Sequence, residues 1–126
     1  MIHNGPIPYF VHGVIDYLAG ALLIVAPFLF GFTGRGAATA VSIVLGVLVL
    51  IFAASTDGPT SLVNSIPVPV HILFDIGAGV LAIASPFLFG FSGDGTATPF
   101  FIAFGVVELL VVIATRFPKE KRAVQA

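Results

Sequence analysis

Cysteine is absent from this 126-residue chain, and charged residues are scarce. Without cysteine, the chain cannot form disulfides, zinc–thiolate sites or iron–sulfur clusters. Only 9% of its residues are charged, whereas an ordinary soluble domain has about 25%. The net charge is −1 and the basic residues form no stripe, which argues against nucleic acid as a partner. The chain is instead 58% hydrophobic with a mean hydropathy of +1.13, which is typical of an integral membrane protein surrounded by lipid.

An internal repeat covers most of the chain. Residues 7–57 return at 66–116 with changes but without a gap, at an offset of 59 residues. The pattern Ile-Pro-x-x-Val-His-x-x-x-Asp begins at Ile7 and again at Ile66. A constant period indicates one structural unit present twice. We therefore divide the chain into a first two-helix repeat (1–57), a polar linker (58–65), a second two-helix repeat (66–116) and a charged C-terminal tail (117–126).

Four segments are long and apolar enough to cross a bilayer as helices, which takes about 20 residues. They lie at roughly 9–29, 37–55, 68–88 and 97–115. A glycine-rich stretch follows the first and third segments, as expected for a tight reversal. The sequence thus predicts an all-α membrane protein with four transmembrane helices, arranged as two tandem helical hairpins that run parallel to each other.

The distribution of basic residues predicts an orientation. Four spans place both termini and the linker on one side of the membrane and the two glycine-rich turns on the other. The first side carries four basic residues of the tail, Arg116, Lys119, Lys121 and Arg122. The second side carries only Arg35. This bias predicts cytoplasmic termini. We expect the chain from Arg116 onward to be solvated.

Ionisable side chains inside membrane helices are costly and are therefore functional candidates. Five fall within the predicted spans: His12, Asp16, His71, Asp75 and Glu108. The His and Asp of each repeat are four residues apart, so they share one helix face and can hydrogen-bond. Matching positions in parallel repeats also place both pairs at the same depth. Glu108 has no counterpart, because Val49 stands at the matching position.

Three interpretations of these residues stay open. In the first, each His/Asp pair is structural and ties its helix to a neighbour or to the linker. In the second, Asp16, Asp75 and Glu108 carry protons or ions across the membrane. In the third, His12 and His71 bind a cofactor: they serve as axial ligands of a haem, or join the two Asp residues around a divalent metal ion.

Small residues predict where the helices pack. Ala38, Ser42 and Gly46 are spaced four apart on the second segment, a stripe that allows close approach of membrane helices. Gly20 and Gly79 extend the two His/Asp faces by the same step.

Each repeat also carries a motif at the end of its first helix. The motif reads Ala26-Pro27-Phe28 in the first repeat and Ser85-Pro86-Phe87 in the second, each followed by Leu-Phe-Gly-Phe. In its two-helix plan and in this motif the chain resembles the SPW-repeat family of small bacterial and archaeal membrane proteins. Phenylalanine replaces the family's Trp in both copies, and Ala26 replaces the Ser in the first. The resemblance implies a membrane location, which we expect to be the bacterial inner membrane, and a two-by-two helix arrangement, but no reaction.

Short loops leave no room for an extramembrane catalytic domain. We therefore expect a non-enzymatic structural or accessory module that forms a homo-oligomer or packs in a larger membrane complex. A metal- or haem-binding protein and a proton-linked transporter remain the alternatives.

Overall fold

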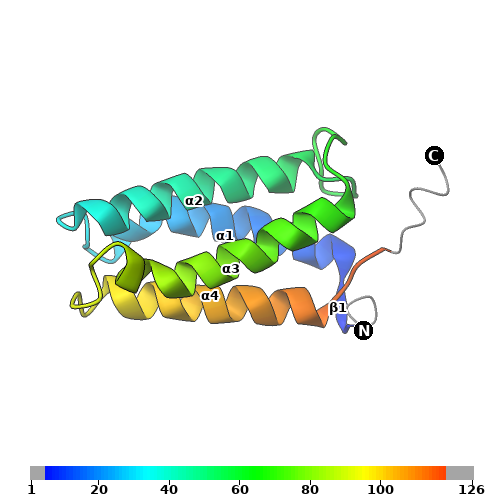
Figure 1. Ribbon diagram of the computed structural model, residues 1–126. Coiled ribbons are helices and arrows are strands. Elements are labelled where there is room, and N and C mark those ends of the chain that lie inside the picture. Colours follow the sequence, from blue (N-terminus) through cyan, green and yellow to red (C-terminus); the bar gives the residue numbers. More distant parts are fainter. Residues whose placement is uncertain (1–4, 119–126) are drawn as a thin grey trace.

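The computed structural model describes residues 5–118 and is almost entirely helical. Its helices are α1 (Tyr9–Leu29), α2 (Gly36–Ser55), α3 (Val68–Leu88) and α4 (Ala97–Ala114) (Figure 1). Each is long and apolar enough to cross a membrane. The helix ends lie within one residue of the predicted spans, and the predicted all-α membrane fold is confirmed.

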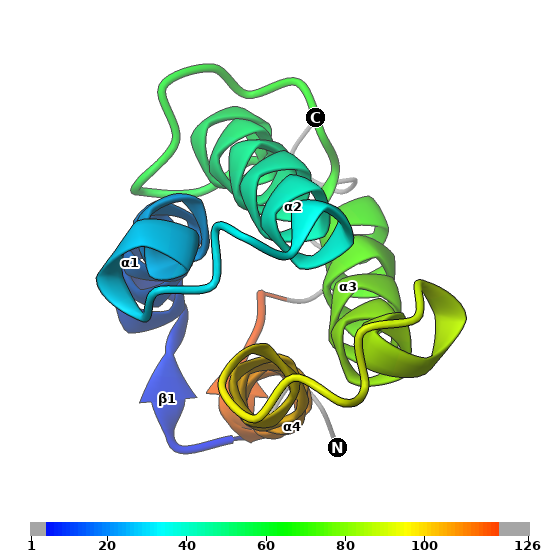
Figure 2. The same cartoon turned by 90° about the vertical axis from the view of Figure 1, so that its left-hand side faces the viewer.

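The four helices form two antiparallel hairpins that run in the same direction (Figure 1). Seen end-on, they surround a common centre in the order α1, α2, α3, α4, so α1 and α3 face each other (Figure 2). Both hairpins reverse at a glycine with the same left-handed backbone, Gly31 and Gly90, each with φ of 73°. Only glycine adopts this conformation without strain. Equal turns after equal helices give the two repeats the same shape.

Within each hairpin, the helices approach closely at glycines. A Cβ on Gly46 would lie 2.8 Å from the carbonyl oxygen of Gly20. The second hairpin repeats this contact, where a Cβ on Gly105 would lie 2.5 Å from the carbonyl oxygen of Gly79. Any larger side chain at these positions would push the helices apart. The first hairpin adds a hydrogen bond of 2.5 Å from the buried Ser42 hydroxyl to the Leu23 carbonyl, and Ala38 is also fully buried.

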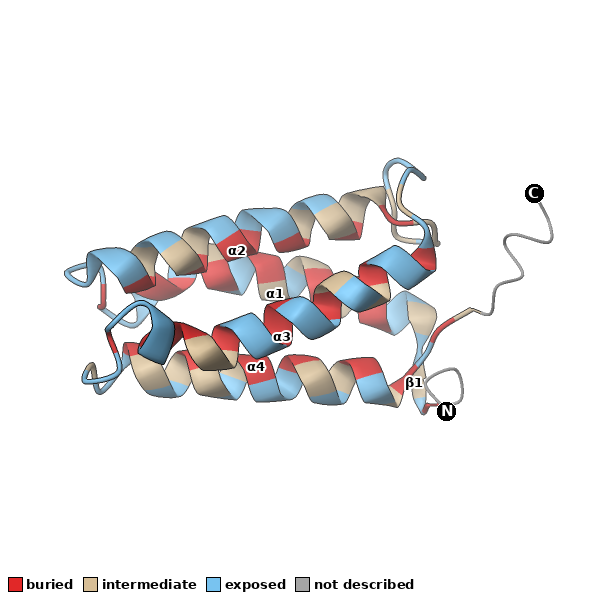
Figure 3. Cartoon of the chain, in the orientation of Figure 1, coloured by how far each residue is buried: buried red, intermediate tan, exposed pale blue. Residues whose placement is uncertain are grey.

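Between the hairpins, the core near the turns is aromatic. Phe32 and Phe91 occupy matching positions and are both 2% exposed. They pack against Phe101 with ring centroids 6.2 and 5.1 Å apart. The outward faces of all four helices are instead exposed and apolar (Figure 3). In a membrane protein, such faces contact the lipid chains.

Contacts at both ends of the bundle join the two repeats. At the turn end, Arg35 Nε donates to Asp94 Oδ2 at 3.2 Å, and these two residues occupy matching positions. At the opposite end, the short strands β1 (Ile7–Pro8) and β2 (Thr115–Arg116) pair in parallel. A matching bridge joins Thr56 and Ile66. The first strand of each repeat thus meets the end of the other repeat.

One prediction about the tail is wrong. Phe117, expected in a solvated tail, is 2% exposed. Its ring lies 5.0 Å from the His12 ring and 5.8 Å from the Tyr9 ring, centroid to centroid. Pairing of β1 with β2 carries the chain past the start of α1, where an aromatic side chain finds an apolar surface. The other residues of the predicted basic tail, Lys119, Glu120, Lys121 and Arg122, lie outside the described residues.

Candidate functional site

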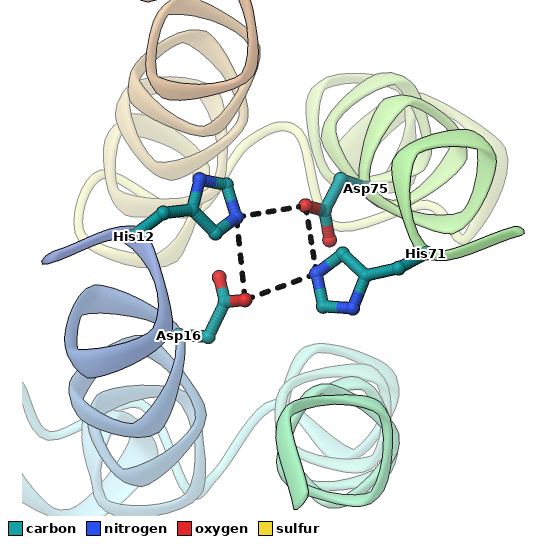
Figure 4. A group of neighbouring side chains, drawn as sticks. All are labelled: His12, Asp16, His71 and Asp75. Atoms are coloured by element: carbon teal, nitrogen blue, oxygen red, sulfur yellow. Dashed lines mark hydrogen bonds and ion pairs between the residues drawn. The ribbon is translucent and has the colours of Figure 1, made fainter. Parts of the chain in front are cut away.

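The His/Asp pairs of the two repeats meet in the centre of the bundle. His12 and Asp16 point inward from α1, and His71 and Asp75 point inward from α3 (Figure 4). All four side chains are buried, with exposures between 1% and 4%. We call this set the His/Asp ring. It lies at the bundle end that holds the linker, because both pairs fall within the first eight residues of their helices.

Equivalent helix starts bring the two pairs to the same level. Pro8 and Pro67 precede α1 and α3 with nearly identical backbone angles, −64°/149° and −65°/149°. His and Asp then follow at the same distances along each helix, four residues apart and therefore on one face. Because α1 and α3 run parallel across the centre, matched sequence positions become matched heights.

Four nitrogen–oxygen contacts close the ring. Within the repeats, His12 Nε2 lies 3.3 Å from Asp16 Oδ2, and His71 Nε2 lies 3.0 Å from Asp75 Oδ2. Between the repeats, His12 Nε2 lies 3.1 Å from Asp75 Oδ2, and His71 Nε2 lies 3.0 Å from Asp16 Oδ2. Each imidazole therefore faces one carboxylate of its own helix and one of the opposite helix.

A threonine hydroxyl holds the far side of each imidazole. His12 Nδ1 lies 2.8 Å from Thr115 Oγ1, and His71 Nδ1 lies 2.7 Å from Thr56 Oγ1. Both hydroxyls also donate to the carbonyl four residues earlier, at 2.6 Å. A hydroxyl has one hydrogen to donate, so each threonine oxygen must accept from the imidazole. We therefore assign the hydrogen to Nδ1 in both rings, which directs both Nε2 atoms at the carboxylates.

The His71 Nε2 atom differs from its counterpart, His12 Nε2, in its bonding geometry. It is buried and makes no hydrogen bond of good geometry with any residue from 5 to 118, although both carboxylates lie 3.0 Å away. A ring nitrogen has a single bonding direction, in the plane of the ring, and hydrogen bonds weaken steeply off that axis. We infer that the two contacts of His71 Nε2 are electrostatic and that its bonding direction points between the two carboxylates.

A third carboxyl group lies beside the ring. Glu108 on α4 is 7% exposed, and its carboxyl group interacts electrostatically with Asp75 and Asp16. All five intramembrane ionisable residues thus gather in one region. The matching Val49 on α2 is also buried, so an apolar side chain fills that place in the first repeat.

The ring is enclosed by aromatic side chains and by the linker. Phe117 packs against the His12 ring, and Phe52 lies 6.2 Å from the His71 ring. The linker lies against α1, because Tyr9 donates to the Asp57 carbonyl at 2.6 Å and Tyr17 donates to the Thr60 carbonyl at 2.8 Å. Thr60 also lies so close to α1 that a Cβ added to Gly13 would overlap the Thr60 side chain.

The repeated Pro-Phe motifs lie at the opposite end of the bundle from the ring. Pro27 and Pro86 are buried in the last turns of α1 and α3, while Phe28 and Phe87 are exposed. Ser85 donates to the Leu81 carbonyl at 2.6 Å, within its own helix. Exposed rings at helix ends are typical of residues at the membrane boundary.

Sequence reasoning missed several contacts that the repeat could have revealed. Thr56 and Thr115 are matching positions, as are Arg35 and Asp94, and Gly105 matches Gly46, which was already among the predicted packing residues. Comparing the two repeats position by position, with attention to identical or oppositely charged residues, would have singled them out.

The fold and the ring define a class: a four-span integral membrane protein built from two parallel hairpins with a buried polar centre. The model of one family, the SPW repeat domain, matches residues 10–115. The chain therefore belongs to the SPW-repeat family, as the resemblance predicted. Neither the curated proteins nor the solved structures contain a match to this chain.

Proposed function

We propose that this protein is a non-enzymatic structural module of the bacterial plasma membrane that associates with further copies of itself. In this proposal, the His/Asp ring locks the two hairpins into one rigid unit, and the outward helix faces carry the association. The observation that supports the lock most directly is that each imidazole contacts a carboxylate of the opposite repeat, at 3.0 and 3.1 Å.

Buried polar contacts between hairpins are a suitable way to hold a membrane protein together. Lipid chains are as apolar as leucine, so apolar side chains gain little by leaving the lipid for a neighbouring helix. Close packing and buried polar contacts must hold such hairpins together. Glycine contacts provide the packing inside each hairpin, and the ring provides polar contacts between them.

Self-association is supported by an outward glycine on α3. Gly77 is exposed, and among residues 5–118 no atom other than those of its chain neighbours and its own helix backbone lies within 4 Å of where its Cβ would be. Glycine inside a helix costs about 1 kcal/mol relative to alanine, so it is usually present for a reason. Gly20, Gly46, Gly79 and Gly105 instead face a neighbouring helix and allow close helix contacts within the protein. Gly77 fits the same use between two proteins, since the matching position holds the exposed Leu18.

The experiment compares the purified wild-type chain with Gly77→Leu, which places at position 77 the residue found at position 18. Leu18→Ile is the control on the equivalent face of α1. The proposal predicts an oligomer for the wild type and for the control in mild detergent and in lipid nanodiscs, by mass measurement. It predicts a smaller species for Gly77→Leu with unchanged helix content. A wild-type protein that is monomeric in both environments would contradict the proposal.

We further propose that both termini are cytoplasmic. Arg116 supports this, as do the basic residues beyond the described part of the chain. Since the chain has no cysteine, single variants such as Gly34→Cys and Asn64→Cys allow clean labelling with a membrane-impermeant thiol reagent. The expected result in intact cells is labelling at position 34 but not at position 64.

Proton-linked transport through Asp16, Asp75 and Glu108 stays a prediction. Two apolar grooves lie at matching places between the hairpins, one beside Leu81 and the other beside Leu22. No residue of the ring lines either groove, so neither supports a path to these carboxylates.

A further inference from the structure

Four ligand atoms of the His/Asp ring converge on one point between α1 and α3. We propose that the ring binds a single divalent ion of the first transition series, of which Zn²⁺ is the type, through Nε2 of the two His and a carboxylate oxygen of each Asp. This binding activity goes beyond the proposed structural role. Both repeats contribute equally, with two ligands each: His12 and Asp16, and His71 and Asp75.

The spacing of the four atoms suits such an ion. Bonds from Zn²⁺ to His nitrogen and carboxylate oxygen are about 2.1 Å, which separates neighbouring ligands by about 3.0 Å in a square and about 3.4 Å in a tetrahedron. The four neighbouring separations in the ring are 3.0, 3.0, 3.1 and 3.3 Å. All four atoms lie within 4.8 Å of one another. The neighbouring separations thus fit a four-coordinate ion, and a tetrahedral site also requires the two separations across the ring to close to about 3.4 Å.

The direction of the imidazoles points to the same place. With its Nδ1 hydrogen donated to threonine, each imidazole directs Nε2 at the centre of the ring. Nε2 of His71 faces two carboxylate oxygens there, each at 3.0 Å, and makes no hydrogen bond to any described residue. A divalent ion at the centre would take the place of the protons that otherwise lie between these nitrogens and the carboxylates, because a metal ion displaces protons from its ligands.

The threonines match the usual surroundings of a metal-binding histidine. A metal-ligating His commonly donates its other N–H to an oxygen acceptor, which fixes the tautomer and the ring orientation. Thr56 and Thr115 accept such hydrogen bonds from His71 and His12. They are positioning residues in the proposed site, because their oxygens lie on the far side of the rings from the ion.

The donor set selects among the possible ligands. Ca²⁺ takes six to eight oxygen ligands and Mg²⁺ prefers oxygen ligands and water, so two imidazoles favour a transition ion over either. Haem does not fit, because the carboxylates of Asp16 and Asp75 occupy the space between the two imidazoles (Figure 4). The geometry thus favours a bare ion over the haem alternative.

The test uses the full chain purified in mild detergent and stripped with a chelator. Zn²⁺ is added, unbound ion is removed by gel filtration, and retained zinc is measured by elemental analysis. We expect one Zn²⁺ per chain. Co²⁺ added to the wild type should give the intense visible absorption of a four-coordinate ion, a signal that depends on no variant.

Variants connect the binding to the ring. His71→Gln and Asp16→Asn each remove a ligand and should weaken Zn²⁺ binding at least 100-fold. Thr56→Val should weaken it 10- to 100-fold, the range expected for a group that orients a ligand. His3→Gln and Asp94→Asn serve as matched controls, because they change the one remaining histidine of the chain and a carboxylate at the far end of the bundle. Both should bind as the wild type does.

Two results would overturn the metal site. One is a wild-type chain that retains no zinc and gives no cobalt spectrum. The other is zinc retained equally by the wild type and by His71→Gln, which would show binding elsewhere. Neither result bears on the proposed self-association when the mass measurements described above are made in the presence of chelator.

Discussion

Removing one imidazole from the ring should destabilise the protein far more than removing an exposed ion pair. His71→Gln deletes the contacts of Nε2 with Asp16 and Asp75 and also the contact with Thr56. Two buried carboxylates then share only His12 between them. Breaking a buried ion pair by removing one partner costs about 3–5 kcal/mol, because the remaining charge has lost its compensation.

Two variants with smaller expected losses in the free energy of unfolding provide a comparison. Thr56→Val leaves the His71 Nδ1 hydrogen unsatisfied, which costs about 1–3 kcal/mol for a buried donor. Arg35→Gln breaks the contact with Asp94 at the turn end, where the arginine side chain is 45% exposed. An exposed pair of this kind contributes about 0–1 kcal/mol. The free energy of unfolding should therefore fall in the order Arg35→Gln, Thr56→Val, His71→Gln, from the smallest loss to the largest.

The assay is reversible unfolding in mixed micelles, in which the denaturing detergent is raised stepwise and helix content is followed by circular dichroism. A chelator is present throughout, so that metal binding does not contribute. His12→Gln should lose as much stability as His71→Gln, because the contacts of the two imidazoles are matched. A loss for His71→Gln no larger than that for Arg35→Gln would refute the reasoning, because it would mean that the ring contributes nothing to the stability of the fold.

Two further predictions concern the hairpins themselves. Gly105→Ala should cost about 1–3 kcal/mol of unfolding free energy, because the added methyl overlaps the Gly79 carbonyl, whereas Gly77→Ala in the same assay should cost nothing. At the turn end, hydrogen bonds from the Ala97 and Thr96 N–H groups, together with Arg35, lower the pKa of Asp94 from its ordinary 3.8. This stabilisation is complete above pH 4 and is lost as the pH falls through the lowered pKa. Asp94→Ala should therefore lose less thermal stability than the wild type between pH 5 and pH 2. An equal loss in the two proteins would argue against a stabilising role of the Asp94 carboxylate.

The sequence predicted the fold well because the signals for it are local. Length, hydropathy and the positions of Gly31 and Gly90 determine the spans and the turns, and the 59-residue offset predicts two equal hairpins. Equal depth of the two His/Asp pairs followed from the same offset.

The contacts across the centre could not be predicted in the same way. Parallel hairpins place His12 and His71 at one height, but only the packing of α1 against α3 decides how far apart they lie. The roles of Thr56 and Thr115 depend on that packing too, since Thr56 lies 15 residues from His71 in the chain and Thr115 lies 103 residues from His12. Phe117 was missed because a charged tail gives no sign that one of its aromatic residues folds back.

A double-mutant cycle between the repeats tests the central claim most directly, namely that the two His/Asp pairs form one ring. The cycle combines His12→Gln with Asp75→Asn, two residues 63 positions apart in the chain whose side chains lie 3.1 Å apart. We predict a coupling energy of about 1–3 kcal/mol for this pair and none for His12→Gln combined with Asp94→Asn. Additive effects of His12→Gln and Asp75→Asn would contradict the account, because they would mean that the two pairs do not meet.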